Sequence, residues 1–226
     1  MISQCAKAAV SAAVALALTT AAQAVSIAPS FSSDSDFVNN FTGTELAVAE
    51  ARWGNNSVGN PLAGDQEILV RPGGTFATDD QDQIDWTTDP FDFDLTFTPT
   101  TSGDASSVEM SFTANGVSVA STYDLSAGGD ILLRIAGGSD AVPTTLEGQS
   151  LTGPAGGAAY WSIAGLDYTQ TTSLSGTSTF TGGTAGSRPS FQFKVTDQIS
   201  TVPAPASLAF LGLGLAGASL AARRRR

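Results

Sequence analysis

The sequence predicts an all-β protein, an antiparallel β-sandwich of jelly-roll type, with an apolar helical segment at each end of the chain. Three observations of the central region indicate this class: it is rich in Gly, Ser, Thr and Asp, it places apolar residues at every second position, and turn-forming residues divide it into short segments. A chain of 226 residues fits one ordinary domain. We therefore expect a domain at residues 25–201, between terminal segments 1–24 and 202–226.

The first 24 residues have the composition of a signal peptide. Lys7 supplies positive charge, an apolar stretch covers residues 8–18, and Ala22-Gln23-Ala24 has the small residues that signal peptidase accepts. The apolar stretch is too short to span a bilayer, which argues against an uncleaved signal helix as anchor. We therefore expect export by the general secretion machinery and cleavage by signal peptidase between Ala24 and Val25.

The clearest predicted strand covers residues 91–98, where four apolar residues alternate with Asp and Thr. Asn115-Gly116 favours a type I′ hairpin turn, so we expect residues 108–112 and 117–123 to form a hairpin. Residues 44–52 alternate too, although several are good helix formers, and a helix is the alternative there. The remaining predicted strands are 67–70, 131–135, 160–163, 177–180 and 190–195.

The central region is strongly acidic, with five Lys and Arg against 21 Asp and Glu and a net charge of −16. Such a surface repels phosphates, which argues against nucleic-acid partners. The chain has no His, and its one cysteine, Cys5, lies in the predicted signal peptide. Histidine-dependent nucleophiles and disulfides are therefore excluded from the mature domain. We expect a protein that is not an enzyme, stabilised by its core or by bound ions.

Seven Asp and no Lys or Arg lie between residues 79 and 94. Four of these acids are candidate oxygen ligands for Ca²⁺, the one cofactor that the sequence suggests: Asp79, Asp80, Asp82 and Asp85. Their spacing lacks the Asp-x-Asp-x-Asp-Gly pattern of a calcium loop. A solvated acidic loop is the alternative.

Two other groups of residues suggest carbohydrate chemistry. Asp92 and Asp94 share one face of a predicted strand, with Cα atoms about 6.8 Å apart, as a glycosidase pair would, although an exposed polar face explains them equally. Four aromatic residues could stack on sugar rings or fill the core. They are Trp53, Trp86, Tyr160 and Trp161.

The C-terminal segment has three consecutive parts. The sequence Val202-Pro203-Ala204-Pro205 precedes an uncharged apolar run, residues 206–222, and the four arginines Arg223, Arg224, Arg225 and Arg226 follow. As a helix the run would be about 26 Å long, near the minimum for crossing a bilayer. Because the arginines and Lys7 both favour the cytoplasm, we expect a transmembrane helix with residues 25–201 on the far side.

This three-part tail resembles the PEP-CTERM sorting signal, with Ala204 where the name-giving motif has Glu. The resemblance implies that a membrane-embedded cysteine protease of the exosortase type recognises the motif and cleaves near it. It also implies transient anchoring in the inner membrane of a Gram-negative bacterium, followed by transfer to the cell surface or extracellular matrix. A permanent tail anchor is the alternative.

Together these features predict an exported, non-enzymatic protein of the cell surface or biofilm matrix with a structural or adhesive role. Its expected partners are the secretion machinery, signal peptidase and an exosortase-type protease. The alternative function is a carbohydrate-binding module, calcium-dependent or not, with the exopolysaccharide of the matrix as its partner.

Overall fold

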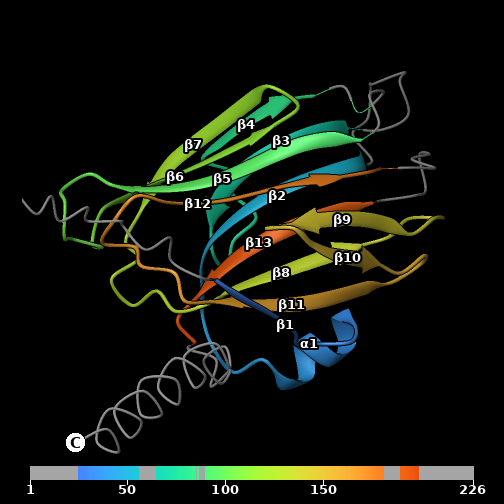
Figure 1. The fold of residues 1–226 in the computed structure, drawn as a ribbon, viewed down its shortest axis with the longest axis horizontal. Helices are drawn as coiled ribbons and strands as arrows, with labels where there is room; N and C mark the ends of the chain where they lie inside the picture. The colour runs from blue at the N-terminus through green and yellow to red at the C-terminus, as the bar shows by residue number, and fades with distance from the viewer. Residues whose placement is uncertain (1–24, 56–64, 85, 87–89, 181–188, 199–226) are drawn as a thin grey trace, which may run out of the picture.

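A computed structural model describes residues 25–55, 65–84, 86, 90–180 and 189–198, which form two antiparallel β-sheets and one short helix (Figure 1). The predicted antiparallel β class is therefore confirmed. Within these ranges no helix is long and apolar enough to cross a membrane. The helices predicted at residues 8–18 and 206–222 lie outside the described residues.

The seven-stranded sheet has the order β1-β11-β8-β13-β2-β3-β4, and the six-stranded sheet has the order β10-β9-β12-β5-β6-β7. The first sheet consists of β1 (Ser26–Pro29), β11 (Ala158–Ala164), β8 (Ile131–Ala136), β13 (Ser190–Thr196), β2 (Glu45–Asn55), β3 (Asp65–Pro72) and β4 (Asp80–Gln83). The second consists of β10 (Gln149–Gly153), β9 (Val142–Leu146), β12 (Thr172–Ser178), β5 (Phe91–Pro99), β6 (Val108–Ala114) and β7 (Val117–Tyr123). Helix α1 (Asp34–Asn40) joins β1 to β2.

Eight of the strands pair from the outside of the chain inward. β2 pairs with β13, β5 with β12, β8 with β11, and β9 with β10. A long hairpin of strands that is rolled up in this way has the pairing order of a jelly roll. β3 and β4 widen one sheet beyond β2, and β6 and β7 widen the other beyond β5.

The two sheets share one apolar core. Because side chains alternate along a strand, β5 turns Phe91, Phe93, Leu95 and Phe97 to the other sheet and its polar residues outward. The ring of Phe93 lies 4.9 Å from that of Phe191 and 5.7 Å from that of Phe193, both on β13. The sheets therefore pack face to face.

Most predicted strands are present. The range predicted at 44–52 forms a strand from Glu45 onward and not a helix, because alternate alanines of β2 fill the core. Asn115 and Gly116 have φ of 46° and 79° between β6 and β7, as a type I′ turn requires. The strand predicted at residues 177–180 lies earlier in the chain, since β12 covers Thr172–Ser178. The sequence patterns did not identify β1, α1, β4, β9 or β10.

Candidate functional site

Residues 26–41, which we call the N-terminal strap, begin as a strand of the seven-stranded sheet and then pass over its outer face. β1 is the edge strand of this sheet and pairs with β11, and α1 follows it below β11 (Figure 1). Ser33 caps α1, since its hydroxyl accepts the Asp36 N–H at 3.1 Å. The Phe37 ring stacks on Tyr160 of β11 at 4.9 Å, and Phe31 meets the same ring edge-on.

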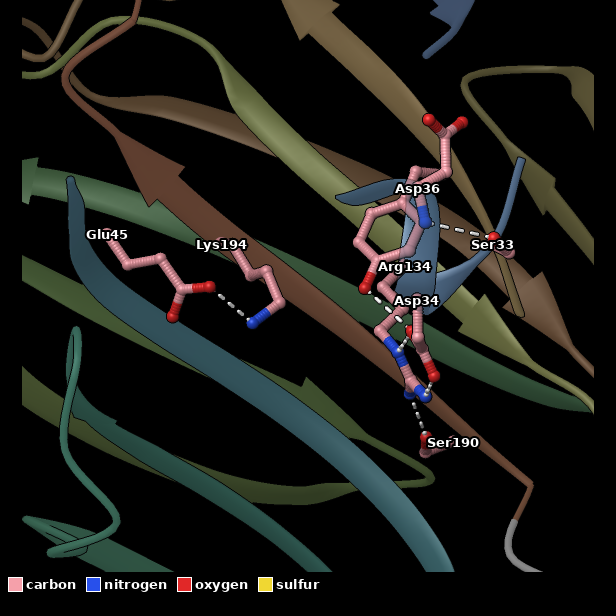
Figure 2. Close-up of polar contacts among 8 residues, drawn as sticks. Ser33, Asp34, Asp36, Glu45, Arg134, Ser190 and Lys194 are labelled. Carbon is pink, nitrogen blue, oxygen red and sulfur yellow. Dashed lines mark hydrogen bonds and ion pairs between the residues drawn. The ribbon is translucent and has the colours of Figure 1, made fainter. Parts of the chain in front are cut away.

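A charged group fixes the strap to the sheet beneath it (Figure 2). The Asp34 carboxylate accepts two hydrogen bonds from Arg134, one from Nε and one from Nη2, each 2.7 Å long. The Tyr160 hydroxyl donates to the same carboxylate at 2.7 Å. Arg134 also donates from Nη1 to the Ser190 hydroxyl at 3.1 Å. One carboxylate of the strap thus joins two neighbouring groups of the sheet, from β8 and β11.

A second ion pair lies beside the first. Lys194 of β13 donates from Nζ to Glu45 Oε1 at 2.6 Å, and both side chains are largely buried (Figure 2). The same ammonium lies 5.5 Å from the centroid of the Phe37 ring, so it also contacts the strap.

The surroundings of the strap fix its protonation states. The hydrogen bond from Arg134 lowers the pKa of Asp34 below its usual 3.8, whereas burial raises the pKa of Tyr160. At neutral pH the carboxylate is therefore ionised and the phenol is neutral. This arrangement holds the strap in place. On α1 itself, an open depression lined by Asp34, Ser35, Val38 and Asn39 faces solvent.

Two of the four predicted calcium ligands connect the edges of the two sheets. The Ala120 N–H of β7 donates to Asp80 Oδ2 at 2.9 Å, and the Ser121 hydroxyl lies 3.4 Å from Asp79 Oδ2. Asp82 is exposed and accepts the N–H of its neighbour Gln83.

Asp85 lies outside the described residues. Among the acidic residues that the structure does describe, no group of three could hold a metal ion. Calcium binding stays a prediction.

Asp92 and Asp94 both lie on the outer face of the six-stranded sheet, where Asp92 is exposed and Asp94 accepts the Thr96 hydroxyl at 2.5 Å.

The aromatic residues predicted for a sugar groove are not brought together. Trp86 is 2% exposed and donates from Nε1 to the Arg52 carbonyl at 3.0 Å, and Tyr160 is 3% exposed beneath Phe37. Neither can stack on a ligand, so the core alternative holds for these two residues: Trp86 fills the core, and Tyr160 lies in the strap interface. Trp53 and Trp161 are half-buried, on strands that β13 and β8 separate.

Sequence reasoning missed the strap. The signal that could have identified it is Ser33 followed by Asp34 and Asp36, a helix N-cap with acids in the first turn. The contact between Asp34 and Arg134 joins residues that are 100 positions apart, and no local pattern marks it.

Comparison with protein families identifies the tail. Residues 201–226 match the PEP-CTERM protein-sorting motif, which confirms the resemblance seen in Val202, Pro203, Pro205 and the arginines. No curated protein matches the chain. The chain is thus an exported protein with a C-terminal sorting signal, and the signal implies a membrane-anchored stage and processing by exosortase-type machinery. The predicted signal cleavage site at Ala22, Ala24 and Val25 stays a prediction.

Proposed function

We propose that this chain is a non-enzymatic protein of the cell surface or extracellular matrix with a structural or adhesive role. The sorting motif at residues 201–226 carries the proposal, because it gives the domain a route to the cell exterior. A β-sandwich with a continuous aromatic core supports it, since such a domain can persist outside the cell without disulfides.

The proposal is tested by intact-mass spectrometry of the protein from its native host, with and without the exosortase-type protease. We expect a product that begins at Val25 and ends near Pro203 in the matrix fraction, and a longer, membrane-bound chain in the protease-deficient strain. A product that still ends at Arg226 in both strains would contradict processing. Loss of matrix cohesion or surface attachment on deletion of the gene would support the structural role.

Carbohydrate binding is a second candidate, favoured by the outer face of the six-stranded sheet. Polar residues of neighbouring strands lie side by side there: Asp94 is paired with Ser175 and Thr113, and Thr96 with Ser173 and Ser111. Hydroxyl and carboxylate groups on a flat face can hydrogen-bond a polysaccharide. Exopolysaccharide from the host should then bind the wild type more strongly than Asp94→Ala, with Asp140→Ala on a distant loop as control.

A further inference from the structure

The chain is fixed to the folded domain up to Gln198. The Asp130 N–H donates to the Gln198 carbonyl at 2.7 Å, and the Gln198 side chain donates to the Thr42 hydroxyl at 2.9 Å. One residue earlier, the Asp197 N–H donates to the Thr44 carbonyl, and Asp197 Oδ1 accepts the Thr44 N–H at 2.7 Å. The folded structure therefore continues almost to the sorting motif.

The remaining connection to the motif is short. Residues 199–202 separate Gln198 from Pro203, the first proline of the motif. Five residue steps span at most about 18 Å even when fully extended. Two packed sheets lie about 10 Å apart, so the maximum length of this connection is less than twice that separation. A protease that binds Pro203 must therefore lie close to the end of the sandwich from which the chain leaves.

Hydrogen bonds between loops define this end, which we call the proximal end. The Gly103 N–H donates to the Thr169 carbonyl, and the Leu125 N–H donates to the Ala105 carbonyl. The Tyr168 hydroxyl donates to the Gly129 carbonyl at 3.1 Å. β1 also begins here, since Ser26 is paired with Ala164. The proximal end comprises residues 42–44, 73–78, 100–107, 124–130, 165–171 and 197–198, so both ends of the described chain lie on one side of the sandwich.

The proximal end is anionic. Its loops contain no Lys or Arg. Asp104 and Asp124 are exposed, and each accepts the backbone N–H of the serine two positions later. Asp167 accepts the Thr169 N–H in the same way. These bonds lower the pKa of all three carboxyl groups, so they remain charged.

We propose that the proximal end docks on the sorting protease while the motif is cut, against a basic surface that surrounds the protease active site. The inference rests on the proposed processing of the tail. The short connection keeps this end close to the bound protease, and the charge of the loops determines the chemistry of the partner. Anionic lipid head groups would repel the same loops, so electrostatics favours a basic protein surface over lipid as the partner of this end.

The test is pulse–chase processing of the full chain in a host that contains the protease, with Asp124→Lys compared with Asp140→Lys. Asp140 is an exposed acid on the loop after β8, at the opposite end of the sandwich. We expect Asp124→Lys to slow conversion of precursor to product about threefold to tenfold, because a rim charge mainly affects the rate of encounter. Asp140→Lys should be processed at the wild-type rate.

A second pair of variants separates docking from folding. A flexible insertion of about 20 Gly and Ser residues after Gln198 lengthens the connection between the domain and the motif. The protease can then bind the motif without holding the domain close to its own surface. Asp124→Lys with this insertion should be processed as fast as the insertion alone. Equal slowing with and without the insertion would indicate a folding or export defect and would overturn the proposal.

Two other outcomes would also overturn it. A wild-type rate for Asp124→Lys at native spacing would show that the proximal end makes no productive contact. Faster processing would show that this end meets anionic lipid, since lysine would replace repulsion by attraction. If the wild type itself is not cut, the proposed function fails and not merely the docking.

Discussion

At the scale of single residues, Asp34 is the clearest point of attachment between the strap and the sheet. We expect Asp34→Asn to lower the free energy of unfolding by about 1–2 kcal/mol at pH 7, because Arg134 would lose its charged partner. Urea unfolding, followed by circular dichroism, measures this difference. Asp140→Asn, which removes an equal charge from an exposed loop, should have little effect.

The same pair predicts a pH dependence. The pKa of Asp34 is lowered in the folded protein, so its contribution to stability is complete above the unfolded value of 3.8 and is lost as pH falls through the folded value. The difference between wild type and Asp34→Asn should therefore shrink below about pH 4. A difference that stays constant down to pH 2 would contradict the ion pair.

Asp80 allows the calcium hypothesis to be tested against a direct structural role. Its carboxylate accepts a backbone N–H of β7, so Asp80→Ala should lower the free energy of unfolding by about 1 kcal/mol. The loss should be the same in excess Ca²⁺ and in EDTA, and Asp82→Ala should lack it. Stabilisation of the wild type by Ca²⁺, absent from Asp80→Ala, would favour a calcium site.

At the scale of elements, the β6–β7 turn depends on a positive φ at Gly116. Gly116→Val should lower the free energy of unfolding by about 1–2 kcal/mol, because a branched side chain is strained at φ 79°. Gly157→Ala is the matched control, since an added Cβ would meet its nearest neighbour at an ordinary 3.6 Å. Thermal unfolding measures the stability of both variants. Equal stability of the two would contradict the turn assignment.

The strap is a second element with a direct test. Phe37→Ala removes a ring that stacks on Tyr160 and contacts Lys194, and we expect a loss of about 1–2 kcal/mol. Amide hydrogen exchange of residues 26–41 should accelerate more than that of β5. Val38→Ala, at a residue 74% exposed on the same helix, should change neither quantity. Unchanged exchange in Phe37→Ala would show that the strap is held by other contacts.

Elements with strong local patterns could be predicted from the sequence, and those without could not. Residues 91–98 alternate without interruption, so β5 was clear, whereas β4 consists of four exposed polar residues and has no apolar face. β9 contains Pro143, which argues against a strand, and its turn uses Glu147 at φ 48°, an unusual residue for that position. Helix α1 is too short to show a helical period.

The candidate sites likewise differ in how far they could be predicted from the sequence. The sorting tail could be predicted because its motif, apolar run and arginines are contiguous in the sequence. The roles of Trp86 and Tyr160 could not, since an aromatic residue in a β protein looks the same whether it binds a ligand or fills the core. Only the fold shows Trp86 beside Phe91 and Phe180.

At the scale of the whole molecule, one core stabilises both sheets. Phe193, on the central strand β13, contacts Phe93 and Phe112 of the opposite sheet. Phe193→Ala should therefore cost about 3–5 kcal/mol, and both sheets should unfold in a single transition. Gln192→Ala, which points to the outer face, is the control. Separate transitions by tryptophan fluorescence and circular dichroism would contradict a shared core.

The position of β13 has a mechanical consequence for a protein that is held by its C-terminal tail. The last strand of the domain lies in the interior of its sheet, with β2 on one side and β8 on the other. Tension applied through residue 198 acts along this strand, so the bonds to both neighbours are sheared together and do not open one after another. In the proposed adhesive role, a pull on the tail would therefore load the hydrogen bonds to β2 and to β8 at once.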